Sequence, residues 1–280
     1  MQITHTIDQT RALAGGELAF VPTMGALHEG HLSLIRHAKQ LAPRVAVSIF
    51  VNPNQFTPDE DFAEYPRPLQ RDLSLCEAEG VDFAFVPSVD EIYPPDAFDV
   101  VIDVPDLATH LEAQYRPGHF VGVCQIVAKL LAIVQPRVVC FGRKDYQQLK
   151  VIEAMIRGLC LPVRVEACPT IREPDGLALS SRNRYLDAEQ RRHALCLHKA
   201  LEEAQQLIEQ EGEVDPAAVE AAMAQQMQAH HMQVDYAVVR DARTLTPVDL
   251  INPRLEPVVC LVAGRLGNVR LIDNRVMSGA

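Results

Sequence analysis

Several features that define large protein classes are missing from this chain of 280 residues. No apolar run approaches the roughly 18 uncharged residues that a membrane-spanning helix needs. The first residues lack the basic start and the apolar stretch of a secretory leader. The seven cysteines are scattered and include no C-x-x-C pair, which argues against a disulfide framework and a zinc ribbon. We therefore expect a cytoplasmic protein with structural thiols and no membrane partner.

Positive charge is also scarce. The chain has 26 Lys and Arg residues against 37 Asp and Glu residues, and its formal net charge is −11. Sequence-independent binding to nucleic acid depends on many cations that face phosphates, so no nucleic-acid partner is expected. A local basic pocket for one small anion is still compatible with this balance. The candidate cations for it are Arg116, Lys144, Arg172, Arg182 and Arg184.

Three common nucleotide and hydrolase signatures are absent as well. No G-x-G-x-x-G follows the first strand-like run, and no G-x-x-x-x-G-K-[ST] occurs, which excludes the usual dinucleotide fingerprint and the P-loop. The chain also lacks a G-x-S-x-G nucleophile elbow, which argues against a serine hydrolase. Any nucleotide site must therefore be built from other residues.

The first part of the chain alternates strand-like and helical stretches. Strands are predicted at 18–21, 44–51, 81–86, 137–141 and 163–167, and helices at 32–39, 68–80, 122–133 and 145–159. This alternation predicts an α/β fold, a Rossmann-like parallel sheet with helices on both faces. Ligands of such sheets bind at the carboxyl ends of the strands, where the polar motifs of this chain occur.

The second part has a different pattern. A long amphipathic helix is predicted at 188–210 with Asp187 as N-cap, and a second helix begins at Asp215-Pro216. Strand-like runs follow at 234–240, 258–263 and 269–272. This order predicts a smaller C-terminal α+β domain. We place the domains at 1–172 and 173–280, with the boundary near 170–176.

The most informative stretch is PTMGALHEGH at 22–31, which lies between a predicted strand and a predicted helix. A helix N-terminus presents unpaired N–H groups and the positive end of its dipole, which suits phosphate. Gly25 and Gly30 allow backbone to approach a ligand closely. His28 and His31 could equally be solvent-exposed residues at a helix start. A zinc site has less support, because the histidines are three residues apart and not four as in a zincin helix.

Three further segments carry candidate chemistry. In FGRKDYQQL at 141–149, Lys144 could contact phosphate and Asp145 could hold Mg²⁺, although Asp is also common in the first turn of any helix. In LALSSRNRYL at 177–186, two hydroxyls and a guanidinium could bind a polyphosphate, or the segment could be a solvated loop. In FVNPNQF at 50–56, the amides could bind a small polar substrate, or form a capped turn.

Taken together, these segments resemble the pantothenate synthetase (pantoate–β-alanine ligase) family of the His-x-Gly-His nucleotidyltransferase superfamily. The resemblance extends over nearly the whole chain and preserves the order of the motifs. A lone His-x-Gly-His would indicate only the superfamily, whereas the full set is far more specific. The matching segments are PTMGALHEGH at 22–31, FVNPNQF at 50–56, EYPR at 64–67, RPGHFVGV at 116–123, FGRKDYQQL at 141–149, DGLALSSRN at 175–183 and LIDN at 271–274.

The resemblance implies an AMP-forming ligase of pantothenate biosynthesis that uses ATP and Mg²⁺ and is typically a homodimer. The pantoate carboxylate attacks the α-phosphorus of ATP and gives pantoyl-adenylate and pyrophosphate. The amine of β-alanine then attacks the acyl carbon, which gives pantothenate and AMP. Activation is needed because a carboxylate has no good leaving group, whereas AMP leaves readily. No residue is identified as the base that deprotonates β-alanine.

The resemblance also implies that domain 173–280 acts as a lid about a hinge near 170–176, and it implies roles for individual residues. The catalytic set comprises His28, His31, Lys144 and Arg182. Pantoate and β-alanine are assigned to Asn52, Gln55 and Gln148, and the Mg²⁺ ion to Asp145. The ATP site is assigned to Met24, Gly25, Ala26, Leu27, His28, Glu29, Gly30, His31, Gly142, Arg143, Lys144, Asp145, Ile171, Leu179, Ser180, Ser181 and Arg182.

Two positions depart from the family pattern. Asn54 occupies a position where the family usually has Met, and Arg143 one where it usually has Glu. Two other functions share part of the pattern. A nucleotidyltransferase that adenylylates a phosphate acceptor would share the histidines and the Ser-Ser-Arg segment, but leaves Gln55 and Gln148 without a role. A non-catalytic nucleotide-sensing or RNA-binding descendant is disfavoured by the acidic balance.

Overall fold

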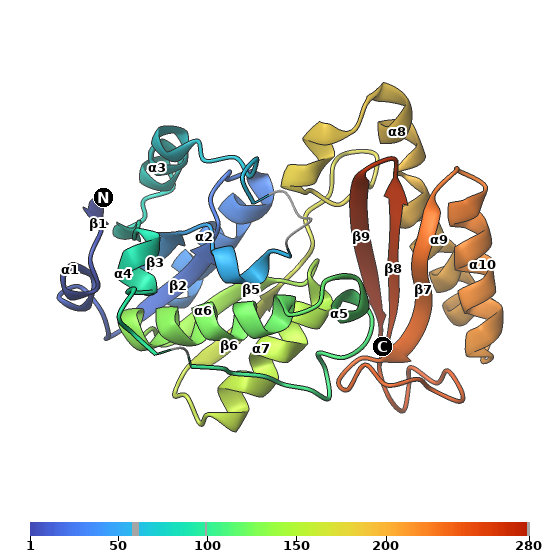
Figure 1. Cartoon of the computed structure of the whole chain (residues 1–280). Coiled ribbons are helices and arrows are strands. Elements are labelled where there is room, and N and C mark those ends of the chain that lie inside the picture. Colours follow the sequence, from blue (N-terminus) through green and yellow to red (C-terminus); the bar gives the residue numbers. More distant parts are fainter. Residues whose placement is uncertain (58–61, 99, 279–280) are drawn as a thin grey trace. The chain divides into compact units, whose positions relative to one another are not determined.

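The computed structural model describes residues 1–57, 62–98 and 100–278. The chain folds into two compact units, and each has its own sheet (Figure 1). Unit 1 comprises Met1–Arg143 and Gln147–Pro169, and unit 2 comprises Lys144–Tyr146 and Thr170–Ala280. Lys144–Tyr146 therefore pack with unit 2, although unit 1 surrounds them in the sequence.

Unit 1 is built on a six-stranded parallel sheet with helices on both faces, which confirms the predicted α/β class (Figure 1). The strand order is β1-β4-β3-β2-β5-β6. The strands are β1 (Gln2–Thr4), β2 (Leu18–Thr23), β3 (Arg44–Ile49), β4 (Phe83–Phe85), β5 (Val138–Gly142) and β6 (Arg164–Cys168). The helices are α1 (Ile7–Arg11), α2 (Glu29–Leu41), α3 (Leu69–Ala78), α4 (Val89–Ile92), α5 (Glu112–Tyr115), α6 (His119–Val134) and α7 (Tyr146–Gly158), with the 3-10 helix η1 at Pro53–Gln55.

The core of unit 1 follows from the alternation along its central strands. Ala19 and Val21 of β2 face one side of the sheet and pack with Leu34 and Ile35 of α2. Successive residues of a strand point to opposite faces, so the fully buried Phe20 lies on the other face. Strands buried on both faces have continuous apolar sequences, which is why β2 and β3 could be predicted from the sequence.

The strand order reverses beside β2. Along the chain, β2 is followed by β3 on one side, and β5 later pairs with β2 on its other side. Such a switch point is where open parallel sheets bind ligands, at the carboxyl ends of the strands. Residues 24–28 leave β2 at this edge, and Gly142 ends the neighbouring strand β5, with Arg143 directly after it.

Unit 2 contains a three-stranded antiparallel sheet, ordered β7-β8-β9, covered by helices (Figure 1). Its core joins apolar residues of the helices, such as Leu201 and Met223, to those of the strands, such as Val262. The strands are β7 (Gln233–Asp241), β8 (Val258–Leu266) and β9 (Val269–Met277). The helices are α8 (Ala188–His193), α9 (Cys196–Gln205) and α10 (Pro216–Gln228), with η2 (Ser181–Tyr185) and the π-helical turn η3 (Gln206–Gln210).

The single helix predicted at 188–210 is interrupted, and this prediction was wrong in detail. Asp187 caps α8 as expected and accepts N–H bonds from Glu189 and Gln190. The helix tightens at Ala194, whose carbonyl accepts from the Leu197 N–H three residues ahead, and α9 begins at Cys196. The amphipathic period survives the break, since Leu197, Ala200 and Leu201 are all buried.

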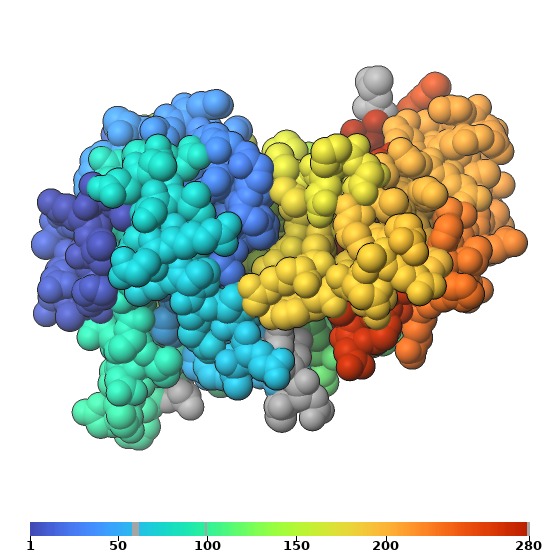
Figure 2. Space-filling model, turned by 90° about the horizontal axis from the view of Figure 1, so that it is seen from above, coloured from blue at the N-terminus to red at the C-terminus, as the bar shows by residue number. Residues whose placement is uncertain are grey.

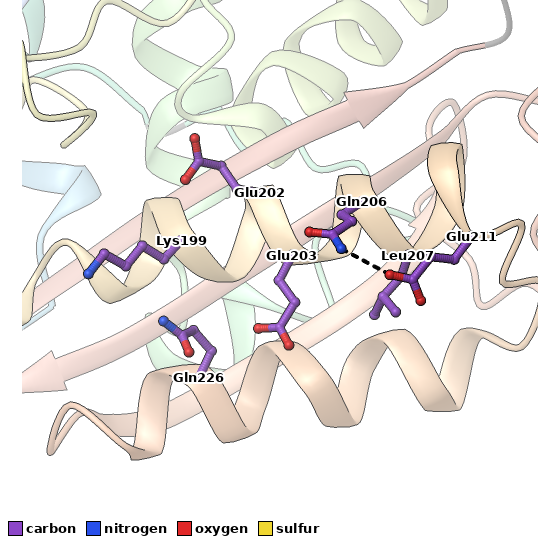
Figure 3. A pocket seen from close by; sticks show the side chains of 7 residues that line it. All are labelled: Lys199, Glu202, Glu203, Gln206, Leu207, Glu211 and Gln226. Atoms are coloured by element: carbon purple, nitrogen blue, oxygen red, sulfur yellow. Dashed lines mark hydrogen bonds between the residues drawn. The ribbon is translucent and has the colours of Figure 1, made fainter.

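Among the residues described, no helix has both the length and the apolar character to cross a membrane. In unit 2, an open pocket of about 390 Å³ lies between α9 and α10 (Figure 3). None of the predicted site residues lines it. Its lining residues are Lys199, Glu202, Glu203, Gln206, Leu207, Glu211 and Gln226.

Candidate active site

The loop that leaves β2 has an unusual backbone that a buried carboxylate holds in place. Gly25 and Ala26 have φ values of 81° and 51°, in the left-handed region that costs energy for a residue with a Cβ. Asp72 of α3, only 1% exposed, accepts the N–H groups of Ala26 at 2.7 Å and Leu27 at 2.8 Å. Leu27 itself is buried in the core. Asp72 therefore sets the path of the chain into His28.

His28 and His31 form a reciprocal cap at the N-terminus of α2. The Nδ1 atom of His28 accepts the N–H of Gly30 at 3.1 Å, and the Nδ1 atom of His31 accepts the N–H of His28 at 3.4 Å. The ring centroids are 4.2 Å apart. A backbone N–H can only donate, so Nδ1 bears the lone pair and the neutral ring carries its proton on Nε2. The cap therefore turns both imidazoles into Nε2–H donors at a helix N-terminus.

Removing the Asp72 carboxylate is expected to destabilise unit 1. Asp72→Ala leaves two buried N–H groups without acceptors, and we expect the free energy of unfolding to fall by about 2–5 kcal/mol. Asp72→Asn keeps one acceptor oxygen, so its free energy of unfolding should lie between those of the wild type and Asp72→Ala. Urea unfolding followed by circular dichroism measures both. A loss below about 1 kcal/mol for Asp72→Ala would show that the loop does not depend on this carboxylate.

Gln55 lies beside the histidine loop, at the end of η1. Its Nε2 donates to the sulfur of Met24 at 2.9 Å, so a residue assigned to pantoate contacts one assigned to ATP. Asn52 is 1% exposed, and its amide is already engaged: it donates to Gln55 Oε1 at 3.2 Å and to Gly122 O at 3.1 Å, and it accepts from Tyr93 at 2.8 Å. Asn52 therefore orients the Gln55 side chain.

The 116–123 motif packs directly on η1, and the sequence alone did not indicate this contact. A Cβ atom at Gly122 would lie 2.1 Å from Asn54 O, so glycine is required there. His119, 5% exposed, makes a 2.7 Å hydrogen bond with the carbonyl of Gln55. Asn54, one of the two departures from the family pattern, donates from its amide to Gln125 of α6 at 2.8 Å.

Two adjacent glutamines in the first turn of α7 have different surroundings. Gln147 is 3% exposed and bonds to the backbone of the 107–112 segment, donating to Leu107 O at 2.7 Å and accepting from Glu112 N at 2.9 Å. Gln148 is half-buried. Gln148, the residue predicted to bind pantoate, points in a different direction from Gln147, because residues one apart on a helix do not face each other.

The end of β5 carries Gly142 and Arg143. The Arg143 N–H donates to Cys168 O at 2.8 Å, which ties this end of β5 to β6. Cys140 of β5 and Cys168 of β6 are buried thiols. Their interaction raises the pKa of Cys140 above the ordinary thiol value and lowers that of Cys168. All seven cysteines of the chain are free thiols, and six of them are buried.

In unit 2, residues 171–179 form a short hairpin that leads into the Ser-Ser-Arg segment. Leu179 N donates to Ile171 O at 2.9 Å, so the two residues assigned to adenine lie opposite each other. Ser180 caps η2, with its hydroxyl accepting the N–H of Arg182 at 3.3 Å. Ser180, Ser181 and Arg182 are all half-buried. The yellow to gold part of the chain, to which this segment belongs, forms part of the face seen in Figure 2.

Lys144 and Asp145 belong to the same unit. Their charged groups are 3.8 Å apart, and the side chains are 20% and 51% exposed. In the described parts of the chain, no three His, Cys, Asp or Glu residues lie so as to hold a metal ion. Asp145 offers one exposed carboxylate, the type of donor that would hold a Mg²⁺ ion together with phosphate oxygens. Glu29, by contrast, is exposed and paired with Arg36.

Comparisons with known proteins match nearly the whole chain. A family-wide sequence pattern described as Pantoate-beta-alanine ligase matches residues 2–276. A pantothenate synthetase of Sulfurihydrogenibium sp. is 50% identical over 262 residues, which cover 93% of this chain and 92% of that protein.

Two crystal structures extend the likeness to three dimensions. Pantothenate synthetase from Thermus thermophilus has a TM-score of 0.94 at 41% identity, with full coverage of both chains. Pantoate-beta-alanine ligase from Francisella tularensis, described as complexed with beta-gamma ATP and beta-alanine, has a TM-score of 0.78 at 33% identity and covers 100% of this chain and 99% of that one. The chain therefore belongs to the pantoate–β-alanine ligase family.

Proposed function

We propose that this chain condenses pantoate with β-alanine in an ATP-dependent reaction that releases AMP and pyrophosphate. Family membership supports this ligase activity, and a related ligase was crystallised with an ATP ligand and β-alanine. The single observation that carries the proposal is the reciprocal cap of His28 and His31. It supplies two Nε2–H donors in the segment that follows β2, and Gln55 contacts Met24 of the same segment.

The reaction needs alignment and charge neutralisation more than covalent help from the protein. A pantoate carboxylate oxygen forms a bond to the α-phosphorus of ATP as the bond to pyrophosphate breaks. The amine of β-alanine then adds to the acyl carbon, loses a proton, and AMP departs. Negative charge grows on the phosphate oxygens during the first step. Preorganised donors aimed at those oxygens lower its barrier.

In unit 1, we assign the phosphate-directed donors to His28 and His31, with His31 closest to the reacting group. Residues 24–31, with Gly142 and Arg143, are assigned to the nucleotide. Gln55 and Gln148 hold pantoate, and Gln55 also meets β-alanine. Asn52 contributes by holding the Gln55 amide, to which it is hydrogen-bonded at 3.2 Å.

In unit 2, we assign the phosphate charge to Lys144, Ser180, Ser181 and Arg182. Ile171 and Leu179 contact adenine. Asp145 would hold a Mg²⁺ ion bound to the phosphates, and such an ion neutralises phosphate charge when bound. A lysine suits a polyphosphate as a compact point charge, whereas the Arg182 guanidinium can donate to two oxygens at once.

Two further properties are proposed with narrower support. A homodimer is proposed from the family resemblance alone, and light scattering on the eluting protein would test it. A reducing, cytoplasmic location is proposed because all seven cysteines are free thiols.

The test of the proposed function is the exchange of labelled pyrophosphate into ATP with β-alanine absent. We expect exchange that requires pantoate, because formation of pantoyl-adenylate is reversible. Addition of β-alanine should then yield pantothenate and AMP in equal amounts. β-Alanine alone should support no exchange. Absence of pantoate-dependent exchange would defeat the proposal, and exchange with a phosphorylated acceptor would favour a nucleotidyltransferase.

A further inference from the structure

Asp273 and Asn274 are adjacent polar residues in the middle of β9, within the LIDN motif. Both are buried, at 3% and 6% exposure, in a strand whose register partners on β8 are the apolar residues Val262 and Leu261. Buried polar groups are costly unless each is hydrogen-bonded. Neighbouring residues on a strand point to opposite faces, so this one site in β9 can reach two different segments.

Asp273 reaches the hairpin that leads to the Ser-Ser-Arg segment. Arg172 donates to its two carboxylate oxygens at 2.6 and 2.9 Å, and also to Gly176 O at 3.0 Å. The Asp273 side chain is only 1% exposed, so this bidentate pair is shielded from water. Such a pair fixes both distance and orientation. The hairpin is therefore attached to β9 close to its turn.

Other contacts leave this hairpin little freedom. Arg191 of α8 binds Glu173 and Asp175, each at 2.8 Å, and lowers the pKa of Asp175. Gly176, with φ at 98°, lies so close to α9 that a Cβ there would be 2.1 Å from the His198 ring. The 171–179 hairpin, which leads into Ser180, is consequently a rigid part of unit 2.

Asn274 reaches the second segment. Its Nδ2 donates to the backbone carbonyl of Lys144 at 2.7 Å. Two residues further on, the hydroxyl of Tyr146 donates to Ala242 O at 2.8 Å. These bonds explain why Lys144–Tyr146 cluster with unit 2. A lysine side chain is long and flexible, so its charge is well placed only if its backbone is held.

We propose that Asp273 and Asn274 are positioning residues which hold Lys144 and the Ser180–Arg182 segment at a fixed separation suited to one polyphosphate. The inference rests on the proposed function, because it takes both segments as phosphate-binding. Neither residue touches substrate. Asn274 acts through the Lys144 backbone, and Asp273 acts through Arg172 and the hairpin.

A double-mutant cycle on ATP affinity separates positioning from general stability. Asn274→Asp keeps the size of the side chain but replaces the donor with an acceptor, and we expect ATP to bind about tenfold more weakly by calorimetry. Lys144→Ala removes the group on which Asn274 acts. In the Lys144→Ala background, Asn274→Asp should change ATP affinity by less than about twofold. Asn252→Asp, an exposed change of the same kind in unit 2, is the control and should leave affinity unaltered.

An equal loss of affinity in both backgrounds would overturn the proposal, since Asn274 would then act on stability or elsewhere. If circular dichroism shows that the Asn274→Asp variant is unfolded, a second cycle combines Asp273→Asn with Arg182→Ala. We expect the same coupling in ATP affinity. Because the readout is binding, failure of the proposed function is visible separately. Wild-type protein that binds ATP but supports no pantoate-dependent exchange defeats the function, whereas a cycle without coupling defeats the inference.

Discussion

Replacing His31 with alanine is expected to slow pantoate-dependent pyrophosphate exchange by about 10²-fold or more, the loss seen when a preorganised donor to a developing charge is removed. The side chain has two separable parts in this structure. Nδ1 accepts from the His28 backbone, and Nε2 carries the proton that we assign to phosphate. Alanine removes both parts, so it cannot tell capping from catalysis.

Two conservative variants of His31 make that distinction. Asparagine places an oxygen near the position of Nδ1 and keeps the cap, but it lacks a donor where Nε2 was. Glutamine extends an NH₂ donor toward the Nε2 position and leaves the His28 N–H without this acceptor. If donation to phosphate is the role of His31, His31→Gln should exchange faster than His31→Asn, although His31→Asn should be the more stable in thermal unfolding. The reverse order of activities would assign His31 to capping alone.

Among glycine-to-alanine substitutions in unit 1, Gly122→Ala is expected to lower stability the most. The added Cβ would lie 2.1 Å from Asn54 O, 2.4 Å from Asn54 C and 2.8 Å from Gln55 N. These are backbone atoms, so relief requires η1 and α6 to separate, and Gln55 moves with η1. We expect the free energy of unfolding to fall by about 1–3 kcal/mol or more. We also expect the KM for pantoate to rise by at least about tenfold, which corresponds to about 1.4 kcal/mol of binding.

Gly158→Ala is the matched control for Gly122→Ala. Gly158 is the last residue of α7, and a Cβ there would meet nothing within 4 Å. Alanine is the better helix former by about 1 kcal/mol, so this variant should be neutral or slightly stabilising. Denaturant unfolding and pantoate titration of exchange measure both variants. Equal behaviour of the two would contradict the close packing of α6 on η1.

The success of sequence-based prediction depended on the range of the interaction. Strands β2 and β3 were predictable because burial on both faces produces uninterrupted apolar runs. The helix predicted at 32–39 from its apolar period is α2, which begins three residues earlier at Glu29. In contrast, β1 has only three residues, two of them exposed, so its sequence carries no comparable signal.

Residues that act through distant partners were harder to find. Asp72 reads as an ordinary polar position of an amphipathic helix, and its partners Ala26 and Leu27 are about 45 residues away. His119 and Gly122 belong to a quoted motif, but nothing local indicates that they support Gln55. Asp273 likewise owes its positioning role to its ion pair with Arg172, which is 101 residues earlier. Pairings of this kind leave no periodic trace in either segment.

The amino-acid sequence alone determined the family, the α/β class and the chemical groups available for the reaction, because periodicity and motif order are properties of neighbouring residues. Tertiary structure decided which of those groups are held and by what. It assigned the proton on the capping histidines to Nε2, attached Lys144 to the sheet of unit 2, and placed the Asp72 carboxylate beneath the β2 loop. These outcomes depend on packing between segments remote in the chain, and only the folded backbone brings such segments together.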